Sequence, residues 1–296
     1  MLSDRTRLHI ALQKSGRLSD ASRELLRDAG FRIQSGKNSL TARVENFPAE
    51  LMFVRDDDIP TFVSDGVCEF GIVGQNVLEE FAADRGDLGY EVLAELGFGR
   101  CSLKLAAPES AVYQGPSSLA GQRIATSYPR LLGRFLRDNG VDATIVTMNG
   151  AVELAPRLQI ANFICDLVST GATLEANNLR ALDTVLDSQA VLIRTNRPMD
   201  AGRMEISAGL MSRIDGVLAT KESKYIMMNA PGEALKTITD ILPGAEAPTI
   251  VPLHGRPGHF AVHAVCQESV FWETLQKLKG AGASAILVVP IEKMMM

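Results

Sequence analysis

The chain of 296 residues lacks the two commonest phosphate-binding patterns of soluble enzymes. Neither G-x-x-x-x-G-K-[ST] nor G-x-G-x-x-G occurs, which excludes the usual P-loop and the dinucleotide-binding turn. Only four histidines are present, and they lack the third ligand and the nearby carboxylate of a zinc site. No Ser-His-Asp or Cys-His arrangement can be assigned. The sequence therefore argues against covalent nucleophilic catalysis and favours a site that holds two substrates in line.

Cysteine pairs, long apolar runs and basic tracts are also missing. The four cysteines are scattered without a C-x-x-C pair, which is typical of buried free thiols in a reducing cytoplasm. No apolar run approaches the ~20 residues of a membrane span, and the first residues do not resemble a signal peptide. The net charge is −5 without a basic tract, which argues against general nucleic-acid binding. We therefore expect a cytoplasmic protein that contacts neither membranes nor nucleic acids.

The first two-thirds of the chain alternate between strand-like and helical segments. Residues 8–12, 51–54 and 70–74 predict strands of a doubly wound parallel sheet. The pattern restarts near residue 100, and a strand at 190–194 suits a return into the first sheet. Two lobes of this kind leave a cleft that the carboxyl ends of the strands face.

These patterns predict an α/β fold with a two-lobed, periplasmic-binding-protein-like body. We expect catalytic lobe I at residues 1–100 plus 180–200 and catalytic lobe II at residues 101–179. The last part alternates as β, α, β, β, α, β, which is typical of a ferredoxin-like unit. We assign this C-terminal domain to residues 221–296, a common place for a regulatory ligand or a subunit contact.

The run at residues 165–174 is the segment most suggestive of a ligand site. An apolar strand that carries Asp166 ends in a turn rich in hydroxyl groups, and a helix begins after it. Gly171 permits positive φ, and the backbone N–H groups of such a turn point toward one place. Hydroxyl donors are added by Ser169, Thr170 and Thr173. The turn predicts a phosphate-binding loop, although a well-capped strand-to-helix turn explains the same residues.

Other candidate ligand groups follow the ends of predicted strands. Lys14 and Arg17 could reach a phosphate or a purine face, or could be surface charges of a solvated loop. Arg55 precedes an acidic triplet, 56–58, that offers carboxylates to magnesium but is explained equally well as a helix cap. We therefore assign only Arg55 to a ligand. Tyr128 is a candidate for stacking or hydrogen bonding, or a packed strand-end side chain.

A helix is predicted from about residue 152 to 162, with Glu153 in its first turn. The Glu153 carboxylate could accept hydrogen bonds from a ribose or an exocyclic amine. It could equally interact with the positive end of the helix dipole.

Taken together, the motifs resemble ATP phosphoribosyltransferase in its long form, the family that opens histidine biosynthesis. The most specific motif is Asp166-Leu167-x-x-Thr170-Gly171-x-Thr173-Leu174. Matching segments run through the whole chain in order: Gln13–Leu18, Val54–Pro60, Phe70–Glu80, Ile124–Pro129, Glu153–Leu174, Glu222–Pro231 and Pro248–Leu253.

The resemblance implies a glycosyltransferase that moves phosphoribosyl from phosphoribosyl pyrophosphate to N1 of ATP, with Mg²⁺ as cofactor. It implies feedback inhibition by histidine and a homo-oligomer that passes from dimer to hexamer. The magnesium ligands stay unassigned. The expected phosphoribosyl-pyrophosphate site comprises Asp166, Ser169, Thr170, Gly171, Ala172 and Thr173.

The resemblance assigns roles to the other candidates as well. The expected catalytic residues are Lys14, Arg17, Arg55 and Glu153, and the expected nucleotide-binding residues are Lys14, Arg17, Arg55 and Tyr128. Asn229 and Thr249 are expected in a histidine pocket of the C-terminal domain. One position departs from the family pattern: Gln159 stands where a glycine is expected. We place Gln159 inside the predicted helix, where loss of a glycine favours the helix.

Three other function classes compete with this interpretation. A two-lobed body could simply capture a solute, but the export signal of such a binding protein is missing. The ligand-sensing body of a transcription regulator would need a helix-turn-helix, and none precedes it. A catalytically silent regulatory paralogue is the third, and retention of Lys14, Arg17 and the 169–173 loop argues against it.

Overall fold

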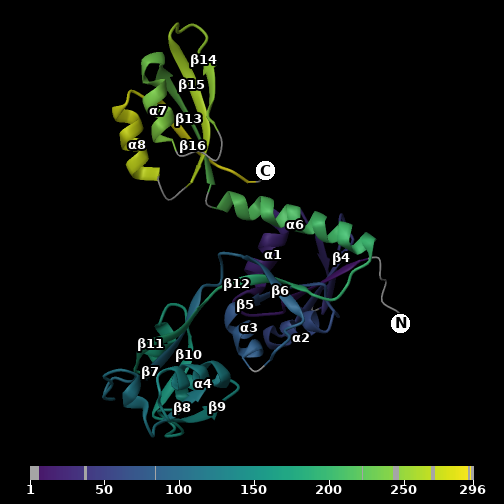
Figure 1. Cartoon of the computed structure of the whole chain (residues 1–296), viewed down its shortest axis with the longest axis vertical. Coiled ribbons are helices and arrows are strands. Elements are labelled where there is room, and N and C mark those ends of the chain that lie inside the picture. The colour runs from purple at the N-terminus through teal and green to yellow at the C-terminus, as the bar shows by residue number, and fades with distance from the viewer. Residues whose placement is uncertain are drawn as a thin grey trace. The chain divides into compact units, whose positions relative to one another are not determined.

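The computed structural model describes residues 7–36, 39–83, 85–221, 223–242, 247–267, 271–292 and 294. The chain divides into two compact units (Figure 1). The first unit comprises Met1–Glu24 and Phe31–Ile206, and the second comprises Leu25–Gly30 and Ser207–Met296.

The first unit contains a seven-stranded sheet with the order β2-β3-β4-β1-β5-β12-β6. Its strands are β1 (Leu8–Gln13), β2 (Ile33–Ser35), β3 (Thr41–Val44), β4 (Ala49–Val54), β5 (Phe70–Gly74), β6 (Tyr90–Glu95) and β12 (Ala190–Thr195). β1 pairs in parallel with β4 and β5, which confirms the predicted parallel centre. β12 returns into this sheet between β5 and β6, as predicted, and is antiparallel to both.

Helices and short helical turns connect the strands of this sheet: α1 (Ser19–Asp28), η1 (Asp56–Asp58), α2 (Ile59–Ser64) and α3 (Gln75–Ala82). Every residue of β5 is buried, as a strand covered on both faces should be. α2 lies so close to β5 that a Cβ on Gly71 would be 2.7 Å from Ile59 Cγ2. A glycine is therefore required at this point for helix and strand to pack. Asp58 precedes α2 as expected of a cap, but its side chain makes no capping hydrogen bond.

The first unit also contains a five-stranded sheet with the order β11-β7-β10-β8-β9. Its strands are β7 (Cys101–Pro108), β8 (Arg123–Thr126), β9 (Thr144–Thr147), β10 (Phe163–Val168) and β11 (Leu179–Ser188). Its helical segments are η2 (Pro116–Leu119), α4 (Pro129–Asp138), η3 (Val152–Leu154) and α5 (Ala172–Ala176). Pro129 is the first residue of α4, where its missing N–H costs nothing.

The strand β11 belongs to the five-stranded sheet because it pairs with β7 over its whole length. We expected lobe I to resume at residue 180, whereas the chain re-enters the seven-stranded sheet only with β12. The sheet boundary therefore lies about one strand later than the predicted lobe boundary. The domain limits themselves stay predictions.

The second unit contains a βαββαβ fold, as predicted. Its elements are β13 (Ser223–Pro231), η4 (Gly232–Ala234), α7 (Leu235–Ile241), β14 (Thr249–Pro252), β15 (His259–Gln267), α8 (Phe271–Gly280) and β16 (Ser284–Pro290). The strand order is β14-β15-β13-β16, and each neighbouring pair is antiparallel. This arrangement is ferredoxin-like. The helix α6 (Ala201–Lys221) precedes it in the chain.

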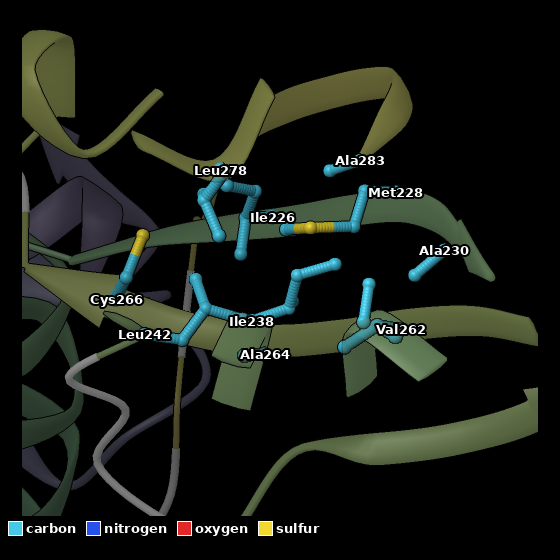
Figure 2. Close-up of a cluster of buried hydrophobic side chains, with 11 residues drawn as sticks. Ile226, Met228, Ala230, Ile238, Leu242, Val262, Ala264, Cys266, Leu278 and Ala283 are labelled. Atoms are coloured by element: carbon cyan, nitrogen blue, oxygen red, sulfur yellow. The ribbon is translucent and has the colours of Figure 1, made fainter. Parts of the chain in front are cut away.

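One face of this four-stranded sheet forms the core of the second unit. Along β13 the buried side chains alternate, with Ile226 and Met228 facing the helices. Figure 2 shows these side chains meeting Ile238 of α7 and Leu278 of α8. Because this cluster contains only residues of the second unit, the unit has its own hydrophobic core.

The predicted helix from 152 to 162 is wrong. Only the single turn η3 forms, and Gln159 has a φ of 57°, in the left-handed region. Pro156 has no N–H to donate to the carbonyl of Val152, so the helix cannot continue through it. The Ile160 N–H then bonds to the Ala155 carbonyl at 2.9 Å and turns the chain toward β10. A position with positive φ favours glycine, which explains why the family pattern expects glycine where this chain has Gln159.

Replacing Gln159 by glycine should leave the free energy of unfolding unchanged or raise it by up to about 1.5 kcal/mol. Relief of the left-handed conformation, about 1–2 kcal/mol, is partly offset by the flexibility of glycine in the unfolded chain, about 0.4–1 kcal/mol. The β-branched substitution Gln159→Val should lower the free energy of unfolding by about 1 kcal/mol or more. Urea denaturation at unchanged slope measures both values. A loss of about 1 kcal/mol for Gln159→Gly, as in a helix, would contradict this conformation.

Candidate functional site

A pocket of about 430 Å³ lies within the first unit, at the carboxyl ends of strands from both of its sheets. Arg55, Asp56 and Asp57 line it directly after β4. The rest of the lining comes from α3 (Val77, Glu80, Phe81), from the residues that follow β8 (Ser127, Tyr128, Pro129, Arg130), and from the end of β9 and the turn after it (Thr147, Asn149). Strand carboxyl ends are where α/β folds bind their ligands. We call this hollow the interlobe pocket.

The interlobe pocket brings together two of the predicted ligand residues, Arg55 and Tyr128. The Arg55 guanidinium lies 3.6 Å from the Asp57 carboxylate, and both side chains are largely exposed. An exposed pair of this kind contributes little to stability. Arg55 can therefore exchange this partner for a ligand phosphate at low cost.

Tyr128 is held in a negative environment. Burial raises the pKa of its hydroxyl above the ordinary value, the Asn76 amide opposes this, and the charges of Asp56 and Asp166 add to it. Tyr128 is therefore neutral at physiological pH and keeps its proton for a hydrogen bond.

The start of α4 is already occupied by a carboxylate from α3. Glu80 accepts the backbone N–H groups of Arg130 and Leu131, each at 2.9 Å. Beside it, Glu79 accepts both terminal nitrogens of Arg134 at 3.2 and 3.1 Å. A helix N-terminus is a natural anion site, and here Glu80 takes the place of the anion. The start of α4 is therefore not open to another anion.

Asp166 and Glu153 lie close enough to interact electrostatically. Asp166 is half-buried in β10 and accepts the Leu167 N–H at 2.8 Å. Burial raises the pKa of the Asp166 carboxyl above its ordinary value, and the negative charge of Glu153 raises it further. The structure thus brings together two carboxylates that we expected at the ligand site.

The loop that follows β10 is open to solvent. Gly171 has a φ of 84° and precedes α5, and a Cβ built on it would meet nothing within 4 Å. Within the described ranges, no acceptor is found for the backbone N–H groups of Ser169, Thr170 or Gly171. The Ala172 N–H reaches only Thr170 Oγ1, at 3.5 Å. Ser169, Thr170, Ala172 and Thr173 are exposed. An open row of donors with a left-handed glycine is what a phosphate-binding loop requires.

This loop does not line the interlobe pocket. Ser169 instead lines a neighbouring pocket of about 430 Å³, together with Gln75, Arg100, Cys101, Ser102, Val168, Asp187, Ser188 and Gln189. In that pocket Ser102 donates to Asp187 at 2.6 Å. The loop is linked to the interlobe pocket through Asp166, whose charge acts on Tyr128.

Lys14 and Arg17 are exposed and belong to the loop after β1. The Lys14 N–H bonds to the Val54 carbonyl at 2.8 Å, which places this loop beside Arg55. The Arg17 guanidinium donates to the Gly99 carbonyl. Neither residue lines the interlobe pocket. Their ligand roles stay predictions.

Asn229 and Thr249 lie on β13 and β14, on either side of β15. They align with Ala261 and His263 respectively, so both lie on the sheet face opposite the buried cluster. One strand separates them. Their role in histidine binding stays a prediction.

Sequence reasoning missed four residues that shape the interlobe pocket: Asn76, Glu80, Arg130 and Ser188. Arg130 could have been suspected because it follows Tyr128 and Pro129 at a helix start. The others carry no local signal, since their partners lie about 50 to 110 residues away in the chain.

A family model described as ATP phosphoribosyltransferase matches residues 55–216, and one described as HisG, C-terminal domain, matches residues 220–293. The chain belongs to the ATP phosphoribosyltransferase family. This confirms the resemblance seen in the sequence and the enzyme class, a pentosyltransferase of histidine biosynthesis. It also confirms the two-lobed body with a ferredoxin-like C-terminal unit.

Solved structures are similar to this chain as well. The ATP phosphoribosyl transferase (HisG:HisZ) complex from Thermotoga maritima matches with 25% identity and a TM-score of 0.58, over 70% of this chain and 98% of that one. The alkanesulfonate-binding protein SsuA from Xanthomonas axonopodis pv. citri matches with 16% identity and a TM-score of 0.45, over 72% and 74% of the two chains. Among the described residues, no helix is long and apolar enough to cross a membrane.

Asp166→Asn should raise the melting temperature of the ligand-free protein at pH 7, by an amount on the order of 1–2 °C. The folded-state pKa of Asp166 is raised, so its stabilising contribution is fully present below the unfolded pKa and is lost as pH rises through the folded pKa. The advantage of the amide should therefore shrink toward pH 4. Calorimetry at both pH values measures this, with the exposed Asp142→Asn as control. An equal gain at pH 4 would contradict a raised pKa.

Proposed function

We propose that this enzyme transfers the phosphoribosyl group of phosphoribosyl pyrophosphate to N1 of ATP and releases pyrophosphate. The observation that carries the proposal is one arrangement within the first unit. Arg55 and Tyr128 line a pocket at strand carboxyl ends, and the Asp166 carboxylate acts on Tyr128 from the strand that leads into the open 169–173 loop. A nucleotide and a sugar phosphate would thereby meet at adjoining parts of one site.

The reaction needs alignment rather than a strong base. N1 of adenine is a neutral nucleophile, so no proton has to be removed before it attacks C1 of the sugar. As pyrophosphate departs, positive charge develops on the ribose ring. Asp166 and Glu153 supply negative charge near the ribose hydroxyls, which stabilises this charge. The 169–173 loop holds the 5′-phosphate, so that the sugar stays in line with the nucleophile.

The cationic candidates balance the phosphate charges. Arg55 in the interlobe pocket and Lys14 beside it can contact pyrophosphate or the triphosphate. Arg17 completes this group from the loop after β1. Glu80 occupies the start of α4, so we assign the leaving phosphates to these cationic side chains.

Magnesium fits the donor set of the site. The described residues contain no group of three or more His, Cys, Asp or Glu side chains able to hold a metal. Mg²⁺ commonly takes one or two protein carboxylates and fills its other positions with substrate phosphates and water. Asp56 and Asp57 in the interlobe pocket would suit an ion that arrives with pyrophosphate. When bound, magnesium neutralises charge on the leaving group.

The C-terminal unit is the proposed regulatory part. Its own buried core allows it to carry a separate ligand site, and Asn229 and Thr249 share its open sheet face. We assign histidine to this unit as feedback inhibitor, with assembly from dimer to hexamer as the conformational coupling. The expected location is the cytoplasm, where the nucleotide substrates are made.

Purified protein with ATP, phosphoribosyl pyrophosphate, Mg²⁺ and pyrophosphatase should produce an adduct with its own ultraviolet absorbance. Chelation with EDTA should stop the reaction, and histidine should suppress it. Activity that ignores histidine would overturn the regulatory assignment alone. Absence of adduct despite nucleotide binding would overturn the proposed reaction.

Thr170→Val should raise KM for phosphoribosyl pyrophosphate by about tenfold or more, because a hydrogen bond to a charged phosphate is lost. KM for ATP should change much less. The matched control is Thr144→Val at the start of β9, an exposed threonine outside both pockets. Equal kinetics for the Thr170 and Thr144 variants would contradict the role of the loop.

A further inference from the structure

Asn76, the second residue of α3, is buried behind the interlobe pocket and is 2% exposed. Its backbone N–H donates to Ser188 Oγ at 3.0 Å, and the Ser188 hydroxyl donates back to Asn76 Oδ1 at 2.8 Å. Its side-chain Nδ2 donates to the Tyr128 hydroxyl oxygen at 2.9 Å. Asn76 therefore connects Ser188, at the end of β11, with Tyr128, which lines the interlobe pocket.

The reciprocal bonds with Ser188 fix which end of the amide faces Tyr128. If the amide were turned over, Ser188 Oγ would receive two donors and its own proton would lose the Asn76 oxygen. Ser188 is only 5% exposed, so an unpaired hydroxyl proton there would be costly. The NH₂ group is thus directed at Tyr128.

Gly74 leaves the space that the Asn76 amide occupies in this orientation. A Cβ on Gly74 would lie 2.4 Å from Asn76 Oδ1, closer than any real contact allows. The φ of Gly74 is −74°, so the glycine is required here by the neighbouring side chain and not by its backbone conformation. The segment Gly74–Asn76 is shaped around this one orientation.

The direction of the hydrogen bond between Asn76 and Tyr128 decides whether the Tyr128 hydroxyl can donate its proton to another group. Since the tyrosine oxygen accepts from Asn76, its own proton is left to donate elsewhere. Within the part of the chain that the structure describes, no acceptor for that proton is found. The Tyr128 N–H is fixed by Thr126 Oγ1 at 2.9 Å, and Glu80 fixes the next turn. The hydroxyl is therefore held rigidly at the pocket wall.

We propose that Asn76 is a positioning residue that makes Tyr128 a hydrogen-bond donor to an acceptor atom of the nucleotide in the interlobe pocket. The identity of the ligand rests on the proposed function. The direction of the bond rests on the contacts of Asn76 alone. Asn76 itself does not line the pocket and acts through Tyr128.

Asn76→Asp tests the direction of the bond, because the side chain keeps its shape but loses its donor. The tyrosine proton would then turn toward the new carboxylate and away from the ligand. KM for ATP and the calorimetric Kd for ATP should each rise about five- to tenfold, the effect of one lost neutral hydrogen bond. KM for phosphoribosyl pyrophosphate should change less than twofold. Tyr128→Phe should produce the same pattern.

The double variant Asn76→Asp with Tyr128→Phe separates positioning from simple damage. If Asn76 acts only through Tyr128, the double variant should bind ATP no more weakly than Tyr128→Phe alone. Gly74→Ala, which displaces the same amide, should weaken ATP binding in the wild-type background and not in the Tyr128→Phe background. Thr144→Val is the surface control, and melting temperatures identify any variant that fails to fold.

The outcomes distinguish this inference from the proposed function. If wild-type protein binds ATP but forms no adduct, the proposed reaction fails, and the Kd values of the variants still decide the inference. Unchanged ATP affinity in Asn76→Asp and Tyr128→Phe would overturn the inference while the enzyme activity stands. Additive losses in the double variant would also overturn it. Absence of ATP binding to the wild-type protein would overturn both.

Discussion

The candidate site depends on the polar contacts that one side of α3 makes with α4 and with Tyr128, the residue before α4. Asn76, Glu79 and Glu80 follow one another at helical spacing and reach Tyr128, Arg134 and the first N–H groups of α4. Breaking the Glu80 contact would leave two helix N–H groups without their acceptor and a carboxylate poorly solvated. This cost fixes the spacing of the two sheets at the pocket. Arg55 and Tyr128 therefore line the same interlobe pocket.

The same region concentrates negative charge. Burial and Glu153 raise the pKa of Asp166, and the charges of Asp56 and Asp166 bear on Tyr128. Such crowding costs stability in the ligand-free protein. In the proposed reaction it would become favourable when positive charge arrives, either as an ion carried by phosphates or as charge that develops on a ribose. On that proposal the site is arranged for a later state of the reaction and not for the resting protein.

The sequence predicted the parts of the fold that have strong local patterns. The strands β1, β4 and β5 each contain a short apolar run, and the C-terminal βαββαβ unit shows a regular alternation of elements. The edge strands β2 and β6 and the short strand β3 were not predicted, because they are short or half exposed and lack such runs. The helix predicted at 152–162 failed because Pro156 and the left-handed Gln159 outweigh the helical pattern. The turn at 169–173 could be predicted because its hydroxyl groups and glycine are adjacent in the sequence. The contacts of Asn76 and Glu80 could not, because their partners are distant in the sequence.

An amide at position 76 follows from the charges around it. Asp56, Asp57 and Asp166 all act on Tyr128, so a carboxylate at 76 would add a further negative group to a half-buried site. It would also accept the tyrosine proton instead of supplying one. An aliphatic residue would leave the Ser188 hydroxyl proton unpaired in the interior. Only a neutral group with both a donor and an acceptor satisfies Ser188 and Tyr128 together. Gly74 provides the space that this group needs.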